Sequence, residues 1–163
     1  MVTSAILPAA TSGTDEAGRD LLARCLTGLQ ISIQVAVASA LLGGIVGTLI
    51  GYVAGYARGV ADTILMRLMD TMLAFPNILM AIVVVAVLGS GVRNVTIALA
   101  ITNIPLFARI ARGAMLAELG QVYVESARAT GATPIRIIFR HVAPNTIAPL
   151  VVQVALAMAF AIL

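Results

Sequence analysis

One stretch of this largely apolar chain, residues 123–145, is patterned with charged and titratable side chains and reads YVESARATGATPIRIIFRHVAPN. It holds Glu125, Arg128, Arg136, Arg140 and His141. Cationic side chains form charge-assisted hydrogen bonds with carboxylates and phosphates, so these residues could contact a partner protein or anionic lipid. Catalysis is not indicated, because the chain has neither a Gly-rich phosphate loop of the P-loop form nor a lysine to serve one. We therefore expect no catalytic residue.

The local sequence predicts two short helices with a stop between them. In the first helix, Glu125 and Arg128 are expected to pair, since they are three positions apart. Gly131 suits the position after a helix end. Thr133 is a good N-cap and Pro134 a good first residue for the second helix. The stop should produce an exposed corner.

The second predicted helix has an apolar face and a basic face. The apolar stripe follows at helical spacing and comprises Ile135, Ile138, Phe139 and Val142. Arg136 and Arg140 lie together on another face with His141 close by, and Pro144 ends the unit. Because like charges four apart weaken an isolated helix, something outside should compensate them. On the residues alone, an amphipathic loop resting on anionic headgroups and a docking element for a soluble partner both stay open.

The rest of the chain is too apolar for an ordinary soluble domain, with 61% hydrophobic residues, 10% charged residues and a mean hydropathy of +1.07. No charged residue lies between Arg24 and Arg58, between Asp70 and Arg93, or after His141. Each run can hold the roughly 20 residues that a membrane-crossing helix needs. We therefore predict an all-α, polytopic membrane helix bundle. The single cysteine, Cys25, can form neither an internal disulfide nor a metal site.

Four crossings are predicted, over Leu29–Tyr56, Thr71–Leu88, Asn94–Ala108 and Thr146–Leu163. RGVADTILMRLMD (58–70) would connect the first two, and GSGVRN (89–94) would form a turn. Arginines are most frequent in 56–70 and 109–145, so the positive-inside rule places both segments in the cytoplasm. The expected domains are an extracytoplasmic polar segment, 1–28, which lacks the apolar core of a signal peptide, and a transmembrane domain, 29–163, with the cytoplasmic loop 109–145.

A row of glycines marks the first crossing: Gly43, Gly47, Gly51 and Gly55. Residues four apart share a helix face, so a second helix could approach this side-chain-free ridge closely. Fixed packing and a sliding contact are both compatible with the row.

Two prolines interrupt later apolar runs, and each has an asparagine beside it. Pro76 precedes Asn77, and Pro105 follows shortly after Asn103. Each proline removes one helical hydrogen bond, and the freed polar groups must find partners or face a wet cavity. A satisfied kink or a polar element of a translocation path would explain them. Carboxylates are almost absent from the spans, which argues against a proton-coupled carrier.

The loop resembles the signature loop of ABC importer permeases, which reads Glu-Ala-Ala, three residues, Gly, nine residues, Ile-x-Leu-Pro. ESA (125–127) occupies the triplet, Gly131 has the required spacing and Pro144 closes the motif. Ser126, His141 and Ala143 depart from the pattern. RHVAPN (140–145), however, resembles the RH-x-x-PN form of the dipeptide/oligopeptide/nickel branch.

Two further segments resemble that branch: GTDEAGRDLLAR (13–24) its GTD-x-x-GRD segment, and MRLMDTMLAFP (66–76) its R-x-x-D…FP entry to the next helix. The similarity runs from about Ser12 to Leu163. It implies the permease subunit of an ATP-driven importer, most simply for di- or oligopeptides, in a bacterial or archaeal inner membrane.

By this resemblance, an ATPase-docking element would comprise Glu125, Ser126, Ala127, Arg128, Gly131, Pro134, Arg136, Arg140, His141, Pro144 and Asn145. The implied partners are cytoplasmic ABC ATPases that carry ATP and Mg²⁺, a second homologous permease, an extracytoplasmic solute-binding protein and membrane lipid. No nucleic acid, metal or cofactor is expected on this chain.

Measured against such permeases, the chain lacks a first helix before GTDEAGRD and a last helix after AFAIL, and it ends inside an apolar run. We therefore expect a fragment or a truncated product. Two alternatives stay open: a passive channel or secondary carrier whose basic loop binds lipid, and a non-transporting assembly subunit.

Overall fold

The computed structural model describes residues 21–162, which are helical almost throughout and contain no strand. The elements are α1 (Leu21–Ala57), α2 (Gly59–Leu73), α3 (Asn77–Leu88), α4 (Val92–Glu118), α5 (Val122–Ala129), α6 (Pro134–Arg136), the π-helix η1 (Ile137–Val142), the 3₁₀-helix η2 (Ala143–Thr146) and α7 (Ile147–Ile162). The predicted all-α bundle is confirmed. Most of the GTDEAGRDLLAR motif and of the predicted polar segment 1–28 lies outside the described residues.

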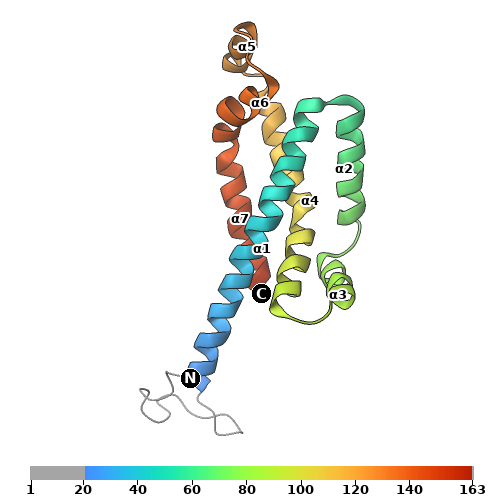
Figure 1. Ribbon diagram of the computed structural model, residues 1–163, viewed down its shortest axis with the longest axis vertical. Helices are drawn as coiled ribbons and strands as arrows, with labels where there is room; N and C mark the ends of the chain where they lie inside the picture. The colour runs from blue at the N-terminus through green and yellow to red at the C-terminus, as the bar shows by residue number, and fades with distance from the viewer. Residues whose placement is uncertain (1–20, 163) are drawn as a thin grey trace.

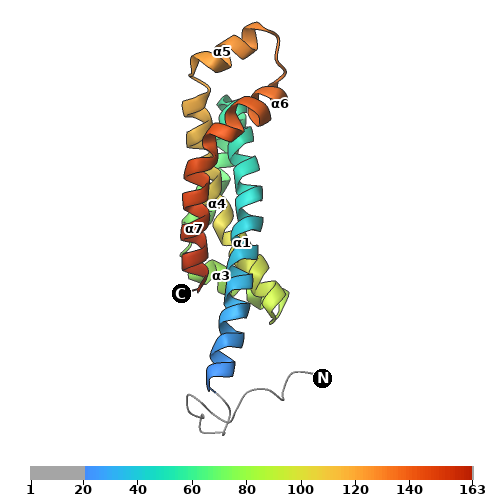
Figure 2. The ribbon, with the colours of Figure 1, turned by 90° about the vertical axis from the view of Figure 1, so that its left-hand side faces the viewer.

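Within residues 21–162, three helical stretches are long and apolar enough to cross a membrane: Leu21–Ala57, Val92–Glu118 and Pro134–Ile162. A fourth crossing is possible if the bent pair α2–α3 counts as one span. Figure 1 shows α1 and α4 rising toward one end of the molecule while α2 and α7 descend from it. The turned view in Figure 2 shows that α5 and α6 cap that same end.

The predicted second crossing, Thr71–Leu88, is not a single helix. Its chain turns between Leu73 and Asn77, and α3 lies at 90° to α2. Pro76 accounts for the break, because it has no N–H to donate and it excludes the residue before it from helical geometry; its own backbone is extended, with ψ 130°. Residues 58–70, predicted as a connecting segment, belong mostly to helix α2.

The predicted third crossing, Asn94–Ala108, extends further than its uncharged residues. Helix α4 continues through Arg109 to Glu118, so the first part of the predicted loop 109–145 is helix. Its 27 residues are about 40 Å long at 1.5 Å per residue, which is ample for a crossing. Pro105 lies buried inside this helix without ending it.

Two buried clusters hold the bundle together. One joins α1, α4, α5 and η1 at the capped end, through Tyr52, Met115, Leu119, Val124, Ile137 and Val142 with Ala111. The other lies further down, where Phe107 of α4 meets Ala40 of α1 and Ala157 of α7. The first cluster ties the predicted docking loop directly to the two central crossings.

Candidate functional site

The corner of the predicted docking loop is a Schellman motif that ends α5. The N–H of Gly131 donates to the carbonyl of Arg128 at 2.9 Å, and the N–H of Ala132 donates to the carbonyl of Ala127 at 3.0 Å. These two bonds satisfy carbonyls at the helix end and require a left-handed residue between them. Gly131 has φ +79°, which glycine adopts without penalty. The predicted helix stop at Gly131 is confirmed.

The second short helix begins as predicted, but the predicted ion pair is absent. Thr133 caps α6, its hydroxyl accepting from the N–H of Arg136 at 3.4 Å, and Pro134 follows at the start of the helix. Glu125 and Arg128 are both exposed, and no ion pair joins them in the described part of the chain. A surface pair of this kind gains little over hydration in water, which explains its absence.

The predicted apolar stripe is wrong in part, because the segment after α6 is a π-helix. Ile137 and Val142 are buried, whereas Ile135 and Phe139 are 71% and 57% exposed. A π-helix bonds residue i to i+5, so residues five apart occupy the positions that residues four apart occupy in an α-helix. The buried pair therefore has five-residue spacing, which an argument from the α-helical period could not find.

Three basic or titratable residues of the loop line one groove. Arg136, Arg140 and His141 form one side, and Ala127, Thr130 and Ala132 of α5 and its C-terminal turn form the other. The groove has a volume of about 460 Å³. We call these six residues the basic groove. Glu125, Ser126, Arg128 and Pro134 of the predicted docking element do not line it.

A tyrosine fastens the loop to the end of α4. Tyr123 donates its hydroxyl hydrogen to the carboxylate of Glu118 and accepts from the Asn145 side chain at 2.9 Å. Asn145 also donates to the carbonyl of His141 at 3.1 Å. Burial, and then the bond to Glu118, raises the pKa of Tyr123, so the hydroxyl keeps its proton. One side-chain network thus joins α4, α5 and η2.

A pair of hydroxyls joins α1 to the end of η2, directly before α7. Tyr52 is buried on α1, and its hydroxyl contacts that of Thr146, which is also buried. Thr146 donates its own hydrogen to the carbonyl of Ala143 at 3.0 Å, so Tyr52 is the donor of the pair. Neither Tyr52 nor Tyr123 was predicted as a site residue, because a tyrosine in the sequence does not indicate which distant residue its hydroxyl will contact.

The glycine row of α1 packs against the backbone of α4. A Cβ added at Gly43 or Gly47 would lie 2.5 Å from the carbonyl oxygen of Ala100 or Ile104, respectively. A Cβ at Gly51 would overlap the carbonyl oxygen of Ala108, and one at Gly55 would lie 2.8 Å from the Met115 side chain. The contacted residues of α4 ascend with the glycines, so the two helices run parallel at backbone contact.

The four predicted pathway residues lie at two places in the fold, the α2–α3 break and α4. Pro76 and Asn77 lie exposed at the α2–α3 break. Asn103 and Pro105 lie on α4, where Asn103 contacts the glycine row: its Cβ is 2.9 Å from a Cβ added at Gly43. None of the four lines the basic groove.

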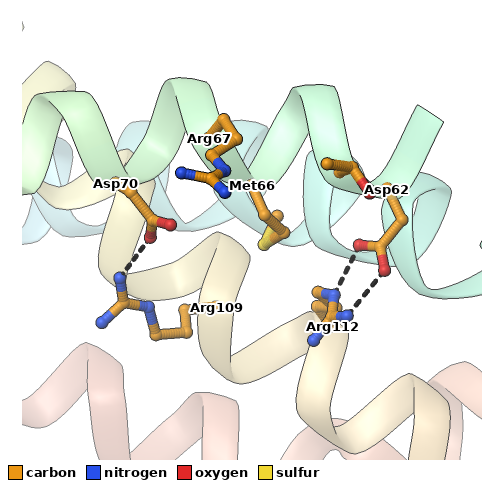
Figure 3. Close-up of a pocket in the computed structure, with 7 residues that line it drawn as sticks. Asp62, Met66, Arg67, Asp70, Arg109 and Arg112 are labelled. Atoms are coloured by element: carbon orange, nitrogen blue, oxygen red, sulfur yellow. Dashed lines mark hydrogen bonds and ion pairs between the residues drawn. The ribbon is translucent and has the colours of Figure 1, made fainter. Parts of the chain in front are cut away.

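Two ion pairs connect α2 to α4, as Figure 3 shows. Arg112 binds Asp62 through two bonds of 2.5 and 2.6 Å, and Arg109 binds Asp70 at 2.6 Å. They border a cavity of about 450 Å³ that Arg67 also lines. Sequence reasoning missed these pairs because the partners are 50 and 39 positions apart. The sequence feature that could have indicated the two ion pairs is the presence of charged residues in apolar helices, where ionisable groups usually pair with each other.

Asp62→Asn should weaken the contact between α2 and α4. The Asp62 and Arg112 side chains are only 14% and 33% exposed, so the variant leaves a partly buried guanidinium without its counter-charge. We expect a double-mutant cycle with Arg112→Gln, measured by thermal unfolding in detergent, to give a coupling energy of about 1–3 kcal/mol.

The matched control is Asp70→Asn with Arg109→Gln, where both side chains are more than half exposed. Its coupling energy should stay below about 1 kcal/mol. Equal coupling in the two cycles would contradict the prediction.

A comparison with known protein families identifies the family of this chain. Residues 47–163 match the family described as "Binding-protein-dependent transport system inner membrane component". The chain belongs to this family. Family membership confirms the resemblance to ABC importer permeases that the loop motif indicated. Together with its apolar helices, it makes the chain a multi-pass inner-membrane protein.

Individual relatives are named for the transport of di- and tripeptides, dipeptides or glutathione. This chain is 44% identical over 151 residues to the di/tripeptide transport system permease protein DppC of Pseudomonas aeruginosa. The match covers 93% of this chain and 50% of that relative. This chain is 43% identical over 156 residues to the dipeptide transport system permease protein DppC of Haemophilus influenzae (96% and 53%). It is 51% identical over 140 residues to the glutathione transport system permease protein GsiD of Shigella flexneri (86% and 46%). The chain spans about half the length of these curated relatives.

Proposed function

We propose that this chain is a permease subunit of an ATP-driven importer of di- or oligopeptides in a bacterial or archaeal inner membrane. The family membership and the relatives named for peptide and glutathione transport support this proposal. The observation that carries it is the position of the signature loop. α5 and α6 extend past the end of the bundle, where a soluble partner can reach them (Figures 1 and 2).

The loop is connected so that a force on it reaches the crossings. Tyr123 links it to the end of α4, and the contact between Tyr52 and Thr146 links its last turn to α1. The helical run from Pro134 continues into α7 up to Ile162. A partner that moved the loop would therefore transmit force to α1, α4 and α7, the crossings that alternating access must rearrange.

In this proposal the chain hydrolyses nothing itself. The partner ATPases bind ATP and Mg²⁺, and their approach on nucleotide binding pushes the docked loops together. A solute-binding protein delivers the peptide from outside, and a second homologous permease completes the pathway. The chain's own residues contribute the docking surface, the helix contacts and the walls of the path.

The test is purification of the chain with its partners from native membranes, followed by reconstitution into proteoliposomes. We expect an ATPase, identified by its peptide sequences, to co-purify, and labelled dipeptide uptake to require ATP and to stop with vanadate. Uptake that proceeds without ATP would establish a channel or carrier instead. Absence of any ATPase from the purified complex would overturn the proposal.

A further inference from the structure

Helix α2 turns a charged face toward α4 and an apolar face away from it. Asp62, Met66 and Asp70 are four positions apart, share one face of the helix and line the cavity between α2 and α4. The opposite face carries three exposed aliphatic residues at the same spacing: Val60, Ile64 and Leu68. Charged side chains in a membrane bundle face its interior or a water-filled cavity. The cavity between α2 and α4 therefore faces water, and the outer face of α2 contacts lipid.

The cavity offers charges of both signs, and one of its cations has no partner. Three arginines and two aspartates line it. Arg109 and Arg112 pair with the aspartates, whereas the side chain of Arg67 makes no hydrogen bond or ion pair within residues 21–162. Figure 3 shows Arg67 and Met66 between the two ion pairs. The unpaired guanidinium favours an anionic group, with which it can form charge-assisted hydrogen bonds.

The two ion pairs differ in how open they are to a ligand. Arg112 binds both carboxylate oxygens of Asp62, and these side chains are the less exposed pair. Arg109 binds one oxygen of Asp70, and both side chains are more than half exposed. The second oxygen of Asp70 has no partner among the described residues. Asp70 can therefore accept a hydrogen bond from a cationic group, about one helical turn away from Arg67.

The dimensions of the cavity suit a short peptide. Its volume of about 450 Å³ lies within the range of about 300–1,000 Å³ for small-molecule sites. The eight positions from Asp62 to Asp70 span about 12 Å of α2 at 1.5 Å per residue. A fully extended di- or tripeptide is about 7–11 Å long at 3.3–3.6 Å per residue. Both charged ends of such a peptide fit between the two ion pairs, whereas those of a pentapeptide do not.

We propose that this cavity binds a di- or tripeptide through its two charged ends, as a station on the translocation path. The inference rests on the proposed function and names the residues of this chain that contact the substrate. Asp70 accepts hydrogen bonds from the ammonium group of the peptide, and Arg67 donates hydrogen bonds to its carboxylate. Met66 also lines the cavity, and its flexible thioether adapts to peptide side chains of different shape.

The experiment measures whether a peptide shields a thiol placed in the cavity. Cys25, the single cysteine, is replaced by serine, and Met66→Cys supplies a thiol that lines the cavity. Gly113→Cys is the matched control, because Gly113 is exposed on α4 beside Arg112 and a Cβ there would meet nothing within 4 Å. Each variant is purified with its partners, placed in phosphatidylcholine nanodiscs and labelled with a membrane-impermeant maleimide, with and without dialanine.

We expect saturating dialanine to slow the labelling of Met66→Cys roughly tenfold, as about 90% occupancy of one site requires, and to leave Gly113→Cys unchanged. N-acetyl-dialanine amide, whose ends carry no charge, should not protect. In the Met66→Cys background, Arg67→Gln should raise the dialanine concentration for half-protection roughly tenfold, and Arg67→Lys should restore most of the affinity. Arg58→Gln, at an exposed residue outside the cavity, should change nothing.

Several results would overturn the proposal. If the maleimide does not label Met66→Cys, water does not reach the cavity. If dialanine does not slow the labelling, or if the uncharged dipeptide protects equally, the cavity does not bind the charged ends of a peptide. Equal protection by pentaalanine would overturn the assignment of both ends to this one cavity. If phosphatidylethanolamine in the nanodiscs slows the labelling and dialanine adds nothing, the cavity binds a zwitterionic lipid headgroup instead.

This inference and the proposed function fail separately. If the complex imports dipeptide with ATP but dialanine does not protect Met66→Cys, only this inference fails. If dialanine protects Met66→Cys but uptake proceeds without ATP, the peptide site stands and the ATP-driven function fails.

Discussion

Gly51→Ala is expected to destabilise the bundle by about 1–3 kcal/mol, the usual cost of overpacking a tight interface. The added Cβ would overlap the carbonyl oxygen of Ala108 and lie 2.7 Å from the Cβ of Ala111. Backbone atoms cannot rotate away as a side chain can, so α1 and α4 must separate. Thermal unfolding of the purified protein in detergent measures the loss.

Gly28→Ala is the control on the same helix, because its added Cβ would meet nothing within 4 Å. Alanine is the better helix former by about 1 kcal/mol, so this variant should be neutral or more stable. The two substitutions are chemically identical and are expected to have opposite signs. Equal effects at the two positions would show that the glycine row is not a packing surface.

Gly131→Val is expected to reduce ATP-driven uptake at least tenfold while leaving membrane insertion intact. With φ +79°, Gly131 occupies a conformation that a β-branched residue rarely adopts. The strain should open the two bonds that end α5 and displace the corner of the docking loop. A Cβ at this position would meet nothing within 4 Å, so crowding plays no part. Uptake into proteoliposomes and the yield of inserted protein are the two measurements.

Gly131→Asn is the matched control for the backbone effect, because asparagine tolerates left-handed geometry better than other side chains. We expect it to retain most of the uptake. If Gly131→Val transports normally, the shape of this corner is irrelevant to coupling. If both variants fail equally, the side chain and not the backbone is responsible.

The crossings could be predicted from sequence because the bilayer requires long uncharged runs, and such runs are visible in composition. α1, α4 and α7 follow from this rule. α2 was missed because Asp62 and Arg67 suggested a segment outside the membrane. Its charge is balanced partly by Arg112 and Arg109 of α4, which are distant in sequence, and no local pattern identifies such partners.

The helix stop and start in the loop could be predicted because they depend on the preferences of single residues. The change from an α-helix to a π-helix could not. Gly131, Thr133 and Pro134 specify a stop and a start through their own backbone preferences, and both were predicted correctly. The apolar stripe was wrong because it assumed the α-helical period. Nothing in IIFRHV (137–142) distinguishes a π-helix from an α-helix. The grouping of His141 with both arginines depends on that difference.

The unbroken helical run from Pro134 to Ile162 has a mechanical consequence. A flexible linker between the loop and α7 would absorb small movements, whereas a continuous helical connection transmits them to α7. The outer end of this connection carries Arg136 and Arg140, and the connection touches α1 where the Thr146 hydroxyl meets that of Tyr52. A short displacement of the loop at the outer end of this run is therefore converted into a tilt of α7.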